Sequence, residues 1–264
     1  MRSFSNHFTI GLMVLLVATP AFAFENDTYE WLVKPTEMRR AGPLDPLEFN
    51  RIKATGNDSE PLFAAGKAQA LIAAAARNDM AAVEALLKEE VSANARDELG
   101  ARPLLHAARN GAVEMVRVLL EAGAAPDVKG GGFTPLTAAA LNGHTQVAAL
   151  LLKTGAMVDM KSDNGNTALM NAVLLNHAHT AKEILKYDPD LTLTNPDGMT
   201  ALSIAAAEGY TESLEAMLKQ GVDPNLIDRN KNPPLFWAVF RGQRGAIRVL
   251  LEYGAEPGTM AVDL

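Results

Sequence analysis

The fold is decided by the stretch from Gly132 to Ala156, which has the sequence GFTPLTAAALNGHTQVAALLLKTGA. Thr134 and Pro135 are typical of a helix start, because a threonine side chain can cap free amide groups and proline fits the first turn. Gly143 marks the end of that helix, where a left-handed backbone is favoured. The leucines at 150–152 then belong to a second helix that ends near Gly155. The stretch therefore predicts two short helices joined by a turn.

The same pattern recurs along the chain at a spacing of about 33 residues. Corresponding units begin near residues 67, 100, 132, 165, 198 and 231. Small alanine pairs recur in the first helix of the units, and they would let neighbouring first helices approach closely. Six copies in one register predict a solenoid in which each repeat contacts only its neighbours.

The combined pattern, G-x-T-P-L-x-x-A-A-x-x-G-H followed by a leucine triplet and G-A, resembles the ankyrin repeat. The resemblance covers roughly residues 67 to 258. It implies an all-α solenoid of about six helix–turn–helix repeats, with turns that project from it. It also implies that a partner protein binds in the concave groove between the turn tips and the first helices. The unit from Lys67 lacks the Thr-Pro start and resembles an N-terminal cap of such an array.

One turn departs from the pattern. The unit from Gly100 is one residue short and has three successive glycines, Gly130 to Gly132, at its turn. Because glycine has little conformational restriction, we expect this turn to be more mobile than the others.

The first 23 residues have the three parts of a secretory signal peptide. Arg2 supplies a positive charge, residues 8–18 (FTIGLMVLLVA) are apolar, and Ala21-Phe22-Ala23 offers a peptidase cleavage site. The apolar run is shorter than the roughly 20 residues that span a bilayer. We therefore expect cleavage after Ala23 and no membrane insertion afterwards. The short positive region and the cleavage site suit a bacterial protein exported to the periplasm.

Residues 24–66 match no repeat and form a leader, or N-terminal extension, ahead of a repeat domain at 67–264. The leader contains several prolines as well as apolar side chains such as Leu44, Leu47 and Phe49. Two interpretations stay open. The leader either covers the hydrophobic edge of the first repeat or becomes ordered only when a partner binds.

Composition narrows the classes of partner. The chain has a net charge of −7, which disfavours binding to the phosphates of nucleic acid. It has no cysteine, so an exported form has no disulfides and depends on its core for stability. We expect a monomer that binds another protein.

The residues do not form a pattern typical of an enzyme. His144 and His177 share a repeat position at which histidine commonly makes structural hydrogen bonds in the resembled family. His179 and Glu183 would share a helix face, but His177 would point elsewhere and no fourth metal ligand is evident. The three glycines at 130–132 are not followed by the lysine of a phosphate-binding loop. We therefore expect no catalysis, no metal and no cofactor.

The register assigns a candidate partner-binding face to the turn tips and to the exposed side of the first helices. The tips are mostly polar. The leucines at 141, 174 and 175 and the aromatic residues predict an exposed apolar groove, unless some of them pack against the neighbouring repeat. The residues assigned to this face are Glu98, Leu99, Arg109, Asn110, Phe133, Leu141, Asn142, Asp163, Asn164, Asn166, Leu174, Met199, Glu208, Arg229, Asn232, Trp237, Phe240 and Arg241.

These observations favour a periplasmic protein-binding module that binds, inhibits or protects an envelope or exported protein. The resemblance implies such roles, because some exported bacterial ankyrin proteins support catalase activity or restrain cell-wall enzymes. The alternative is a secreted effector that binds host proteins, although a signal peptide of this type argues against it.

Overall fold

The computed structural model describes residues 61–97 and 100–257, with side chains described from Gly66 onward. The predicted signal peptide, the leader up to residue 60, and the tip residues Glu98 and Leu99 lie outside the described residues. The helices of the described part are α4 Pro61–Ala76, α5 Met80–Lys88, α6 Pro103–Asn110, α7 Val113–Glu121, α8 Pro135–Leu141, α9 Thr145–Lys153, α10 Ala168–Leu174, α11 Ala178–Leu185, α12 Ala201–Glu208, α13 Thr211–Lys219, α14 Pro234–Phe240 and α15 Arg244–Glu252.

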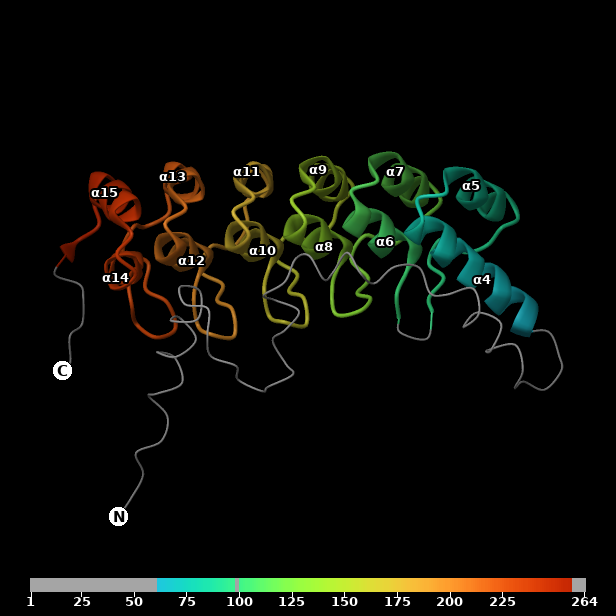
Figure 1. Cartoon of the computed structure of the whole chain (residues 1–264), viewed down its shortest axis with the longest axis horizontal. Coiled ribbons are helices and arrows are strands. Elements are labelled where there is room, and N and C mark those ends of the chain that lie inside the picture. The colour runs from blue at the N-terminus through green and yellow to red at the C-terminus, as the bar shows by residue number, and fades with distance from the viewer. Residues whose placement is uncertain (1–60, 98–99, 258–264) are drawn as a thin grey trace, which may run out of the picture. The chain divides into compact units, whose positions relative to one another are not determined.

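These helices form six antiparallel pairs in two layers. The first helices of the pairs, α4 to α14 with even numbers, lie side by side in one layer, and the second helices form the other layer (Figure 1). Long turns project from the first-helix layer, on the side away from the second helices (Figure 1). Extended structure in the described residues is limited to two isolated bridges. The prediction of an all-α solenoid of six repeats is confirmed.

The threonines predicted to start the first helices do cap them. The Thr137 amide donates to the Thr134 hydroxyl (3.1 Å), while the Thr134 amide donates back to the Thr137 hydroxyl (2.9 Å). The same cap recurs at Thr167, which accepts from the Met170 amide, and at Thr200. Each of these bonds satisfies an amide that the helix itself leaves free.

The first helix differs from the prediction, because α4 begins at Pro61 rather than near Lys67. Its run of alanines and leucine continues the helical pattern backward into the segment that we assigned to the leader. Leu71, Ala74 and Ala75 of this helix are buried in the core that runs through all six repeats. The repeat array therefore starts before residue 67.

The alanine pairs of the first helices are buried as predicted. Ala107, Ala139 and Ala205 are fully covered, and each lies where one first helix contacts the next. Among the described residues, no helix is both long enough and apolar enough to cross a membrane.

The projecting turns are linked to one another by backbone hydrogen bonds. The Asp163 amide donates to the Gly132 carbonyl (2.8 Å), and the Arg229 amide donates to the Gly198 carbonyl (2.9 Å). At the junction between these two, Pro196 takes the equivalent place and has no amide hydrogen to donate. Its ring instead packs against Gly165, where a Cβ atom would lie only 2.6 Å from the proline Cγ. Adjacent turns thus support each other in two different ways.

Candidate functional site

The finger face is our name for the surface formed by the turn tips and the C-terminal ends of the first helices. In three of the turns an oxygen of a polar side chain closes the loop. The carboxylate or amide oxygens of Asp97, Asn195 and Asp228 accept from the amides of Ala101 (2.7 Å), Met199 (2.9 Å) and Asn232 (2.9 Å). Sequence reasoning missed this role, although the signal was present as a polar residue at the same register position. The finger face is therefore a set of ordered turns.

The prediction of an exposed apolar groove on this face is largely wrong. Phe133 and Leu141 are each only 8 % exposed and pack together with Leu105 and Ala138 in a small cluster of their own. Leu175 of the next repeat packs against the same cluster. Since apolar side chains of adjacent repeats lie close enough to touch, they bury one another rather than line an open groove.

Leu174 and Met199 are also not free surface. Both are half-buried and pack against the main core. Phe240, by contrast, is 57 % exposed and is the apolar member of the predicted groove that, among the described residues, stays open to solvent.

Trp237 and Asn166 were assigned to the face but are buried. The Trp237 indole nitrogen donates to the Asp228 carboxylate (2.8 Å), and that carboxylate also accepts from the Asn230 amide (2.8 Å). Trp237 therefore anchors the last turn on α14, and its role is to hold the turn in place. Asn166 lies in the turn closed by the amide of Ser162, which donates to the Asn166 carbonyl (2.9 Å).

The remaining described residues of the prediction do reach the surface. Arg109 is exposed, and its guanidinium carbon lies 5.9 Å from the centre of the Phe133 ring, within the range of a cation–π contact. Arg241 lies 3.5 Å from the Glu208 carboxylate. The exposed positions are Arg109, Asn110, Asn142, Asp163, Arg229 and Phe240, and the half-buried ones are Asn164, Glu208, Asn232 and Arg241.

The histidines at the shared repeat position hold adjacent repeats together, as expected. His144 Nε2 lies 2.9 Å from the Arg109 carbonyl, and His177 Nε2 lies 3.2 Å from the Leu141 carbonyl. Gln243 has the same position in the last repeat and donates to the Ala207 carbonyl (3.1 Å). Each side chain thus satisfies a carbonyl at the C-terminal end of the preceding repeat's first helix.

Glycine is required beneath these histidines for two reasons. Gly143 has a positive φ of 70°, and a Cβ atom there would lie 2.7 Å from the His177 ring. The ring is itself partly withdrawn from water. Burial lowers the pKa of His177 below its ordinary value, and the nearby His144 lowers it further, whereas the bond to Leu141 acts in the opposite direction. Burial also lowers the pKa of His106.

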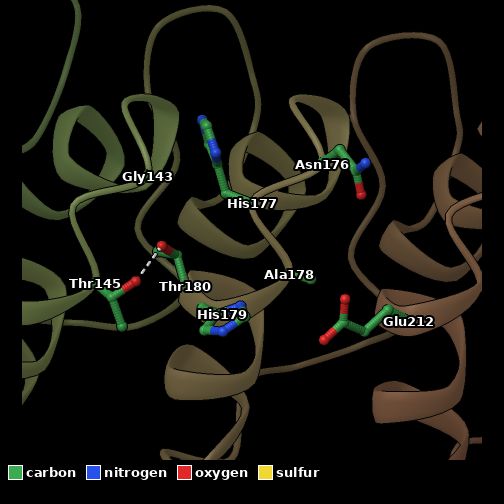
Figure 2. A pocket seen from close by; sticks show the side chains of 8 residues that line it. All are labelled: Gly143, Thr145, Asn176, His177, Ala178, His179, Thr180 and Glu212. Atoms are coloured by element: carbon green, nitrogen blue, oxygen red, sulfur yellow. Dashed lines mark hydrogen bonds between the residues drawn. The ribbon is translucent and has the colours of Figure 1, made fainter.

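A shallow hollow lies beside His177, with a volume of about 280 Å³. It is lined by residues at the starts of α11 and α13, among them His179 and Glu212 (Figure 2). The His177 ring points away from both of these side chains (Figure 2). Glu212 accepts a hydrogen bond from Lys182 (2.7 Å), and the described residues contain no group of three or more side chains that could hold a metal ion. The hollow therefore offers ordinary surface ion pairs and the inter-repeat contact of Thr145 with Thr180 (2.8 Å).

Comparison with known proteins agrees with this architecture. The family model described as "Ankyrin repeats (3 copies)" matches residues 57–130, 125–195 and 176–261. An ankyrin repeat domain from Acinetobacter baumannii AYE, known from a crystal structure, shares 30 % identity with a TM-score of 0.66. The match covers 70 % of this chain and 98 % of that domain. No curated protein matches the chain.

Proposed function

This chain belongs to the ankyrin-repeat family, and we propose that it is an exported module that binds another protein with its finger face. Ankyrin repeats indicate a protein-interaction module. We propose three further points: which face binds the partner, in which compartment the protein acts, and what binding does to the partner. The partner we favour is an envelope or exported protein, which this module would inhibit or protect.

One observation carries the choice of face. Exposed polar side chains recur on it in successive repeats, some at the C-terminal ends of first helices and some on turns that are linked to their neighbours. Arg109, Asn142, Asp163 and Arg229 are exposed in four different repeats. A rigid support avoids the entropic cost of ordering the backbone on binding, so such a row suits recognition of a protein surface.

Export is supported by the sequence of the first 23 residues. A positive start, an apolar run and an Ala-Phe-Ala cleavage site are the features of a secretory signal peptide. Fractionation of cells, with the mass of the purified protein, tests this part. We expect a periplasmic protein that starts at Phe24, whereas a cytoplasmic protein that retains residues 1–23 would contradict export.

A pair of matched charge reversals tests the face. The first variant combines Arg109→Glu with Asp163→Arg on the finger face. The control combines Glu121→Arg with Lys153→Glu on the second-helix layer, where both side chains are exposed. Each double variant leaves the net charge unchanged, and circular dichroism checks that both are folded.

Capture from periplasmic extract, followed by mass spectrometry, then compares the two variants with the wild-type chain. We expect wild type and control to recover the same main partner and the finger-face variant to lose it. Loss in the control, with retention in the finger-face variant, would place binding on the other layer.

A further inference from the structure

The last repeat exposes apolar positions that are covered in the two repeats before it. Val239 is 47 % exposed, although its register equivalents Ala206 and Val173 are fully buried against the next repeat. Leu251 is 44 % exposed, while the equivalent Leu218 is buried. No further helix pair follows α15 in the described part of the chain, so none of the described helices covers this side of the last repeat.

Three aromatic rings enlarge this apolar surface. The Phe236 and Phe240 rings stack with centres 5.9 Å apart and an angle of 12° between their planes. Both pack edge-on against Trp237, at 5.3 Å and 6.3 Å. Because Trp237 is fixed by its bond to the buried Asp228, the exposed Phe240 ring rests on a rigid base. Exposed aromatic side chains with rigid support are typical of sites that dominate binding energy.

The charge of this repeat is opposite to that of the chain as a whole. Residues 229–251 carry five basic side chains and no acidic one before Glu252 at the end of α15, in a chain with a net charge of −7. Arg241 pairs with Glu208. The other four are exposed and, within the described part of the chain, form no ion pair: Arg229, Lys231, Arg244 and Arg248. Two of them lie in the last turn and two lie on α15.

We propose that this end face, made of Phe236, Val239, Phe240 and Leu251 with the exposed Lys231, Arg244 and Arg248, binds an acidic segment of a partner protein in which carboxylates alternate with apolar side chains. The apolar part of such a segment would cover the surface that a seventh repeat would otherwise cover. Its carboxylates would accept charge-assisted hydrogen bonds from the guanidinium groups. The positive field of the repeat would also steer an acidic partner, while it would repel a basic one.

This inference rests on the proposed function, because it names the partner chemistry at one end of a protein-binding array. The two can nevertheless fail separately. The charge reversals at Arg109 and Asp163 lie on interior repeats and leave the end face intact. Suppose that the finger-face variant no longer captures the partner, while the end-face variants bind the peptide as wild type does. That result would support the finger face alone.

The test uses the chain that begins at Phe24 and a labelled synthetic peptide, EDFEELDEFEDL. Its matched control is KKFKKLKKFKKL, which keeps the apolar side chains and reverses the charge. Fluorescence anisotropy gives the Kd of each peptide at low and at physiological salt.

Two variants test the end face. Phe240→Ser removes the exposed ring, and Arg244→Gln with Arg248→Gln removes two charges. Met157→Ser, at an apolar side chain that is 55 % exposed elsewhere on the array, is the control for the first variant. Lys153→Gln with Lys186→Gln, at exposed lysines of α9 and of the turn after α11, is the control for the second.

We expect the acidic peptide to bind and the basic peptide not to bind. Phe240→Ser should weaken binding by about tenfold or more, as expected for loss of a dominant aromatic contact. The arginine variant should weaken binding and make it less sensitive to salt, whereas both control variants should behave as wild type. In a Trp31→Phe background, the emission of Trp237 should change on binding, because this ring contacts Phe240.

Three results would overturn the proposal. The first is an equal Kd for wild type and Phe240→Ser. The second is binding of the peptide only after residues 258–264 are removed, which would mean that the end of the chain itself occupies the face. The third is a dimer in sedimentation that Phe240→Ser dissociates, which would make a second copy the occupant.

Discussion

The interior repeats and the last repeat have the same register but different surroundings, and this difference decides which positions are core. Val173 in α10 and Val239 in α14 are the same residue at the same register position. Val173 is fully buried and Val239 is 47 % exposed, because among the described residues a repeat follows the former and none follows the latter. In a solenoid, a position that faces the next repeat is therefore buried by that neighbour and not by its own repeat.

The largest expected effect comes from placing a charge at these two valines. Val173→Glu puts a carboxylate between two first helices with no partner for its charge, so it should cost about 3 kcal/mol or more of unfolding free energy. Val239→Glu should change stability by about 0.5 kcal/mol or less, since the side chain can reach water. Denaturation with urea, followed by circular dichroism, measures both. Equal losses would show that the last repeat is covered after all.

A pair of leucines allows the same comparison of a buried with an exposed position, this time by shortening the side chain. Leu218 in α13 is buried and Leu251 in α15 is 44 % exposed, at one register position. Leu218→Ala leaves a cavity and should cost about 2–5 kcal/mol. Leu251→Ala removes a side chain that already contacts water, and we expect about 1 kcal/mol or less. Thermal unfolding of the two variants gives the ranking, and a larger loss for Leu251→Ala would contradict the comparison.

The period of the sequence predicted the helices well because each repeat starts and ends with its own local signals. The threonine caps at 134, 167 and 200 and the positive-φ glycines are properties of a few adjacent residues. The start of α4 was placed too late, since the first repeat lacks the Thr-Pro signal and its alanine-rich helix extends back to Pro61.

Burial on the finger face could not be predicted in the same way. Phe133 and Leu141 occupy positions that the register placed at the surface, yet they are covered by Leu105 and Leu175 from the adjacent repeats. Whether a leucine is exposed there depends on the size of the residues one repeat away, which a single repeat does not contain. Trp237 shows the same limit, because its burial depends on the bond to Asp228 in the preceding turn.

A buried hydroxyl group should give a smaller difference in stability between two repeats. The Thr180 hydroxyl lies 2.8 Å from that of Thr145, whereas one repeat later Ser213 has the register position of Thr180 and Ala178 has that of Thr145. The Ser213 hydroxyl is buried and has no hydrogen-bond partner among the described residues. The last repeat has Ala246 at this position. Ser213→Ala should therefore stabilise the chain by about 1 kcal/mol, because it removes an unsatisfied polar group.

Thr180→Ala is the matched change, and it should destabilise by about 1 kcal/mol because the Thr145 hydroxyl loses its partner. Urea denaturation of both variants measures the pair. Destabilisation by Ser213→Ala would mean that its hydroxyl is satisfied in solution.

The smallest expected effect concerns pH and compares His177 with Gln243, which share a register position. Burial lowers the pKa of His177 in the folded chain below its ordinary value of 6.5. Below that value the unfolded chain binds a proton that the folded chain does not, so His177 should destabilise the fold as the pH falls from about 6.5 through the folded pKa.

His177→Gln should retain the bond to the Leu141 carbonyl, as Gln243 does with Ala207, and remove this pH dependence. Urea midpoints measured at pH 7.5 and at pH 5.5 should therefore fall further in wild type than in the variant. Burial also lowers the pKa of His106, so some loss at low pH should remain in both chains. An equal fall in the two would show that the ring of His177 is protonated as easily in the folded chain as in the unfolded one.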